Sequence, residues 1–61
     1  MNANNSIKLF PETKTEALAL AYVQSQDLSG KTPEDVAAMY ADAYDKIKHK
    51  FAELRKLRNS L

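Results

Sequence analysis

The chain has no cysteine and only one histidine among its 61 residues. Without cysteine it can form neither a disulfide framework nor a thiolate metal site, and the single histidine, His49, argues against a structural zinc site within one chain. Chains this short lie near the lower limit for folding alone, and many compensate with disulfides, metal or self-association. Self-association is the reinforcement that this composition leaves open.

Glycine occurs once and proline twice, while hydrophobic residues make up 44% of the chain. This composition is typical of a folded domain rather than a disordered segment. Long hydrophobic runs are also missing, since the longest covers residues 17–23, far too few to span a membrane. Residues 1–6 are polar and uncharged and lack the basic and apolar regions of a signal peptide, so we expect a cytoplasmic protein.

Two helix-start signals are present. Thr13 and Glu16 fit a capping box, in which each side chain accepts a hydrogen bond from the backbone N–H of the other residue. Thr32 is a second N-cap, because Pro33 after it fits the first position of a helix, where a missing N–H costs nothing. Gly30, the only glycine, is placed to take a positive φ in the turn between the helices.

These signals predict an all-α fold, an antiparallel hairpin of a short and a long helix, because a short connection makes its helices neighbours. We expect a polar or extended N-terminal segment over residues 1–12 and the helical hairpin over residues 13–61. Within the hairpin, the expected elements are a helix over about 14–26, a turn over 27–32 and a helix over about 33–58.

The longer predicted helix carries an apolar stripe that the shorter one cannot cover. At about 1.5 Å per residue, the longer helix measures about 39 Å and the shorter one about 20 Å. The shorter helix therefore reaches back only to the level of Lys46. The stripe continues beyond this level through Ile47, Phe51, Leu54 and Leu57. Either the N-terminal residues Ile7, Leu9 and Phe10 cover this part, or another chain does.

The shorter helix is apolar on two sides. At about 100° per residue, Leu18 and Tyr22 point one way, while Leu20 and Val23 point nearly the opposite way. A single neighbouring helix can cover only one of these sides, and a second copy of the hairpin would cover the other. We therefore predict a homodimer that forms a four-helix bundle, with the two hairpins parallel or antiparallel. The predicted core stripe and interface comprise Leu18, Leu20, Tyr22, Val23, Val36, Tyr40, Ala43, Ile47, Phe51 and Leu54.

Charge is divided unevenly along the chain. Residues 1–45 carry three basic and seven acidic side chains, a net charge of −4, whereas residues 46–61 carry six basic and one acidic, a net charge of +5. Such a basic tail can neutralise phosphates, but it equally suits the negative end of a helix dipole and solubility. Contact with a membrane surface also stays open. The candidate nucleic-acid contacts are Lys46, Lys48, Lys50, Arg55, Lys56 and Arg58.

Other patterns favour ordinary structural roles. Asp45, His49 and Glu53 are spaced as a possible metal set, but their line lies opposite the apolar stripe and is better explained as a solvated ladder. The sequence Gly30-Lys31-Thr32 lacks the upstream glycine and strand of a P-loop. No nucleophile–base pair or paired carboxylates mark a catalytic centre. We therefore expect no enzyme activity, no catalytic residue, no metal and no cofactor.

Residues 19–47 carry a Tyr22-Val23 pair, an Asp27-Leu28 pair, a Thr32-Pro33-Glu34 start and the tyrosines Tyr40 and Tyr44. In these features the chain resembles small uncharacterised two-helix proteins of bacterial and phage genomes. The resemblance implies an accessory or regulatory protein and no substrate, cofactor or catalytic residue. The sequence therefore predicts a non-enzymatic helical interaction module that binds itself or a protein partner. The alternative is a small accessory or regulatory protein that binds nucleic acid through the basic tail.

Overall fold

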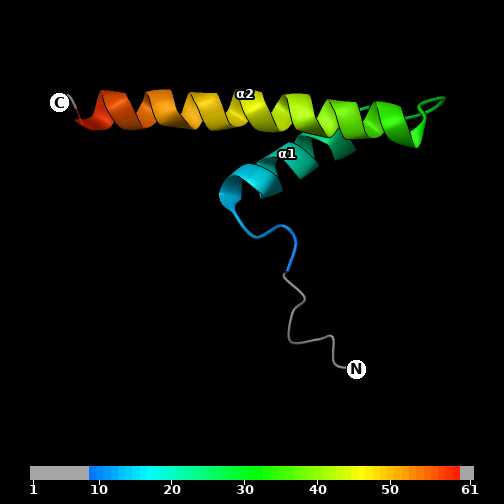
Figure 1. Cartoon of the computed structure of the whole chain (residues 1–61), viewed down its shortest axis with the longest axis horizontal. Coiled ribbons are helices and arrows are strands. Elements are labelled where there is room, and N and C mark those ends of the chain that lie inside the picture. Colours follow the sequence, from blue (N-terminus) through cyan, green and yellow to red (C-terminus); the bar gives the residue numbers. More distant parts are fainter. Residues whose placement is uncertain (1–8, 60–61) are drawn as a thin grey trace.

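The computed structural model describes residues 9–59, and this part of the chain contains two α-helices and no strand (Figure 1). Helix α1 runs over Lys14–Gln24 and helix α2 over Pro33–Asn59. The two helices run in opposite directions and contact each other, consistent with the predicted hairpin. The all-α class is thus confirmed. Predictions placed on residues 1–8, including Ile7, lie outside the described residues.

The start of α1 is fixed by the expected capping box. Thr13 has extended backbone angles, φ −119° and ψ 162°, and its Oγ1 accepts a hydrogen bond from the Glu16 N–H at 3.1 Å. The Glu16 carboxylate accepts from the Thr13 N–H at 3.0 Å and from the Glu12 N–H at 2.8 Å. Three backbone donors at this end are therefore satisfied by two side chains.

Helix α1 ends two residues before the predicted Gln26. The Ser25 hydroxyl donates to the Tyr22 carbonyl at 2.6 Å, and the Gln26 side-chain amide donates to the same carbonyl at 3.3 Å. Serine competes well for nearby backbone groups, so these side chains stabilise a helix end here rather than another turn. The turn that follows holds Gly30 at φ 78°, as its position predicts.

A reciprocal cap also fixes the start of α2. Thr32 Oγ1 accepts from the Asp35 N–H at 3.0 Å, and Asp35 Oδ2 accepts from the Thr32 N–H at 3.1 Å. The sequence indicated the threonine cap, whereas the reciprocal hydrogen bond to Asp35 was not predicted. From this start α2 continues for 27 residues, about 40 Å.

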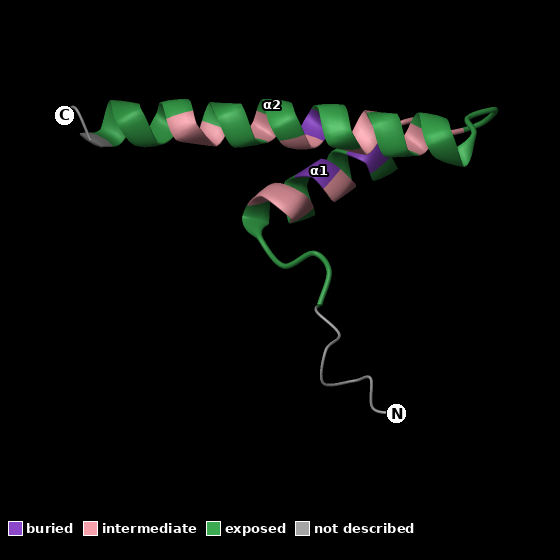
Figure 2. Ribbon diagram, in the orientation of Figure 1, coloured by how far each residue is buried: buried purple, intermediate pink, exposed green. Residues whose placement is uncertain are grey.

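The helices meet through small side chains. Ala19 is fully buried, Val23 is 4% exposed and Ala43 is 7% exposed, and among the described residues no large side chain is fully buried. In Figure 2 the buried positions, in purple, lie on α1 and on the neighbouring part of α2, and Figure 1 shows α1 diverging from α2 toward its N-terminus. The contact between the helices is therefore close but short.

Candidate interaction surfaces

The residues predicted for the core stripe and interface divide into three groups. Val23 and Ala43 are buried within the chain. Three are largely exposed: Leu18 at 48%, Tyr22 at 53% and Leu54 at 43%. The other five are half-buried, namely Leu20, Val36, Tyr40, Ile47 and Phe51.

One exposed apolar surface is formed by Leu18 and Tyr22, which we call the α1 outer face. The two residues lie four apart and so are neighbours on the helix surface. Another side of α1 carries the buried Ala19 and Val23 and the half-buried Leu20. A hollow of about 220 Å³ adjoins Tyr22 and is lined further by Asp42, Ala43, Lys46 and Ile47. The α1 outer face thus continues onto one flank of α2.

The opposite flank holds a short row of aromatic rings. The Phe10 and Tyr40 ring centroids are 6.1 Å apart, and those of Tyr40 and Tyr44 are 6.2 Å apart. Partial desolvation raises the pKa of Tyr40, and the charges of Glu16 and of an ionised Tyr44 raise it further. Packing, rather than an array for stacking bases, describes these tyrosines best, because no lysine or arginine of the described residues lies over their rings.

Of the N-terminal residues that the sequence offered as a cover for the far part of α2, the two described ones, Leu9 and Phe10, do not take that role. Phe10 packs on Tyr40, near the middle of the hairpin, and Leu9 is 81% exposed. The residue that reaches the far part is instead Lys14, whose Nζ lies 4.8 Å from the centroid of the Phe51 ring. A comparison of backbone lengths alone missed this contact, because a lysine side chain extends well beyond its own helix turn.

Lys14 and the end of α2 enclose a second hollow, which we call the tail hollow. It has a volume of about 360 Å³ and is lined by Lys14, Phe51, Leu54, Arg55, Leu57 and Arg58. Two of its three apolar side chains are exposed, Leu54 at 43% and Leu57 at 62%, and Phe51 is half-buried. The sequence predicted an uncovered apolar stripe and a basic tail separately, and the structure brings parts of both into one concavity.

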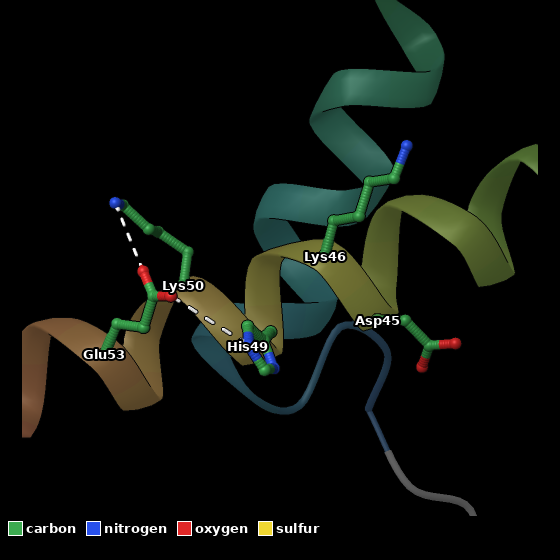
Figure 3. Close-up of a pocket in the computed structure, with 5 residues that line it drawn as sticks. All are labelled: Asp45, Lys46, His49, Lys50 and Glu53. Carbon is green, nitrogen blue, oxygen red and sulfur yellow. Dashed lines mark hydrogen bonds and ion pairs between the residues drawn. The ribbon is translucent and has the colours of Figure 1, made fainter.

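A third, shallow groove runs along α2 past Asp45, Lys46, His49, Lys50 and Glu53 (Figure 3). The Glu53 carboxylate lies between two cationic groups, 3.9 Å from His49 Nε2 and 3.4 Å from Lys50 Nζ, while the Asp45 carboxylate points away from His49. The described residues hold no group of three side chains placed to bind a metal ion.

The six basic candidates for nucleic-acid contact are all exposed. Lys46 pairs with Asp42 at 3.1 Å and Lys50 with Glu53 at 3.4 Å. The other four are in no ion pair with a described residue, namely Lys48, Arg55, Lys56 and Arg58. Of these four, only Arg55 and Arg58 line the tail hollow.

Neither described helix combines the length and the apolar character needed to cross a membrane. Comparisons with protein families, with curated proteins and with solved structures found no match to this chain. The resemblance of residues 19–47 to small two-helix proteins of bacteria and phages therefore stays a prediction.

Proposed function

We propose that this chain is a non-enzymatic interaction module whose two helices complete their fold by pairing with a second copy. The observation that supports this most strongly is the size of the core. Only Ala19, Val23 and Ala43 are buried among the described residues, and large apolar side chains stay in contact with solvent on two sides of the hairpin. Chains of this length need more apolar burial than this to stay folded alone.

The α1 outer face is the surface that suits a second copy best. Leu18 and Tyr22 project from the side of α1 that α2 leaves uncovered, and the adjoining hollow exposes part of Ile47 on α2. Two hairpins that meet through this face would place each α1 between two longer helices. The result is a four-helix bundle, in which an inner helix is apolar on two sides.

Sedimentation equilibrium tests this proposal. We expect a dimer at micromolar concentration, and Leu18→Asp should dissociate it, because an unpaired carboxylate would be buried in the interface. The control is Ala17→Asp, which places the same charge at the adjacent exposed position of α1, away from Leu18 and Tyr22. A monomer at high micromolar concentration would contradict self-association, and equal dissociation by both variants would contradict this interface.

A second candidate is nucleic-acid binding through the basic tail. It is favoured by the exposure of Lys48, Arg55, Lys56 and Arg58, whose charges no described carboxylate neutralises. This candidate predicts binding of duplex DNA that weakens steeply as salt rises. Absence of binding at low salt would eliminate it. Under either function, the cytoplasmic location stays an expectation from the sequence.

A further inference from the structure

The tail hollow combines an apolar floor with a cationic rim, and we propose that it docks a short amphipathic helix of a partner protein, one that carries carboxylates beside its apolar residues. Docking there rests on the proposed function as an interaction module, but it uses a different surface from the α1 outer face. The hollow would therefore serve a partner other than the second copy.

The apolar floor of the tail hollow is long enough to contact nearly two turns of a docked helix. Phe51, Leu54 and Leu57 recur every three residues and extend over about 9 Å of α2, close to two turns of a partner helix. Helices that dock in grooves insert apolar side chains spaced three or four residues apart. Leu54 and Leu57 are exposed enough to receive such side chains.

The rim determines which partner fits. Lys14 comes from α1, and Arg55 and Arg58 come from α2, so positive charge borders the hollow from two elements. Among the described residues that line it, none carries a carboxylate. Arginine offers a planar fork of donors that matches a carboxylate, and Lys14 is held at the hollow by its position over the Phe51 ring. The complementary partner is therefore acidic at the edges of its apolar stripe.

Nucleic acid and membranes fit this hollow less well. A phosphate backbone has nothing apolar to place against Leu54 and Leu57, and most of its binding energy comes from contacts between charges. A bilayer surface is bound best by a continuous apolar helix face that inserts into it. Here the apolar floor is concave and bordered by Lys14 on the neighbouring helix.

The test is a fluorescence anisotropy titration of the full chain with a synthetic helical peptide. The probe carries leucines at positions i, i+3, i+4 and i+7 and glutamates on both flanks. The hollow variant is Arg55→Glu with Arg58→Glu, and the control is Lys48→Glu with Lys56→Glu. Both pairs change the net charge equally and lie on the same basic tail, but only the first pair lines the hollow.

We expect the hollow variant to bind the acidic probe about tenfold more weakly than the unaltered chain, and the control to stay within about twofold. The hollow variant should also gain affinity for a probe whose glutamates are replaced by lysines. Leu54→Ser should weaken binding without changing the charge. Circular dichroism confirms that each variant keeps its helices.

Several outcomes would overturn the proposal. Equal losses in the hollow variant and in the control would assign the binding to diffuse charge. Tighter binding of duplex DNA or of phosphatidylglycerol vesicles than of the probe, lost only in the hollow variant, would assign the hollow to those ligands. A dimer that dissociates in the hollow variant would assign the hollow to the second copy.

The two proposals can fail independently. A monomer that binds the probe would contradict the proposed self-association alone, and a dimer that does not bind it would contradict this docking site alone.

Discussion

Ala19 is the most deeply buried of the described residues, on the helix α1 that contacts α2. Among the described residues of α2, the buried one is also an alanine, Ala43, which is 7% exposed. An alanine at a helix crossing lets two backbones come close, which a larger side chain would prevent. The small volume of this side chain is therefore part of what holds α1 against α2.

We predict that Ala19→Leu destabilises the fold by about 1–3 kcal/mol, because the added side chain has no space at the crossing. Urea unfolding followed by circular dichroism measures this change. Ala17→Leu is the matched control, since Ala17 is exposed on the same helix. Equal stability of the two variants would mean that α1 and α2 do not meet at Ala19.

Tyr40 gives the fold a dependence on alkaline pH. Partial desolvation raises the pKa of Tyr40, with a further contribution from Glu16, so the folded state favours the neutral phenol. The neutral phenol therefore makes its full contribution to the free energy of unfolding below the ordinary tyrosine pKa near 10. That contribution is lost as pH rises through the higher pKa of the folded state.

We predict that Tyr40→Phe loses less stability between about pH 9 and pH 11 than the unaltered chain, because it has no phenol to ionise at this position. Thermal melts at both pH values measure the difference. Tyr22→Phe is the control in a sample dilute enough to keep the α1 outer face unpaired, since Tyr22 is exposed there in the single hairpin. Parallel pH profiles for Tyr40→Phe and the unaltered chain would contradict the prediction.

At the scale of the elements, α2 consists of two parts with different support. Its first part holds the buried Ala43 and lies beside α1 in Figure 1, while no residue over 51–58 is buried and the Lys14 side chain lies over the Phe51 ring. Helical hydrogen bonds alone hold few turns in water, because most helix stability in proteins comes from packing. The far part of α2 should therefore open more readily than the first.

We predict that the amides of residues 51–58 exchange with solvent much faster than those of residues 39–47 in a dilute sample. Hydrogen exchange measured by NMR at two concentrations tests this difference. Protection of residues 51–58 that rises with concentration would show that a second copy covers them. Uniform protection along α2 in the dilute sample would contradict the division into two parts.

The helices could be predicted because their signals are local. Thr13, Glu16, Thr32 and Pro33 determine where helices begin through residues within one turn, and the sequence displays these residues directly. The end of α1 was predicted two residues late, because the choice made by the Ser25 hydroxyl between solvent and the Tyr22 carbonyl depends on geometry. The contact of Lys14 with Phe51 depends on how the helices cross, which no local pattern states.

The candidate surfaces, like the helices, could be predicted where the signal is local but not where it depends on how the helices are placed. Periodicity placed Leu18 and Tyr22 opposite Val23, and the structure has that arrangement, since Val23 is buried and the other two are exposed. Periodicity also identified the uncovered stripe and the basic tail. It could not bring Lys14, Phe51 and Arg58 into one hollow, because that requires the position of α1 relative to the end of α2.

For the molecule as a whole, the proposed pairing makes stability depend on concentration. Binding of a second copy only to the folded chain stabilises that chain by mass action. We predict that the thermal midpoint rises by several degrees over a hundredfold increase in concentration, measured by circular dichroism in cells of different path length. Leu18→Asp should abolish this rise. A midpoint that is independent of concentration in the unaltered chain would contradict pairing.

The absence of a large, fully buried side chain from the described residues also has a calorimetric consequence. The heat capacity of unfolding comes mainly from apolar surface that becomes hydrated, and the single hairpin keeps much of that surface hydrated already. The dilute chain should therefore show a heat capacity change per residue below the usual value of about 12 cal/mol/K. Its melting would be broad and its stability nearly flat with temperature. A partner on either exposed surface would sharpen that transition by adding the missing burial.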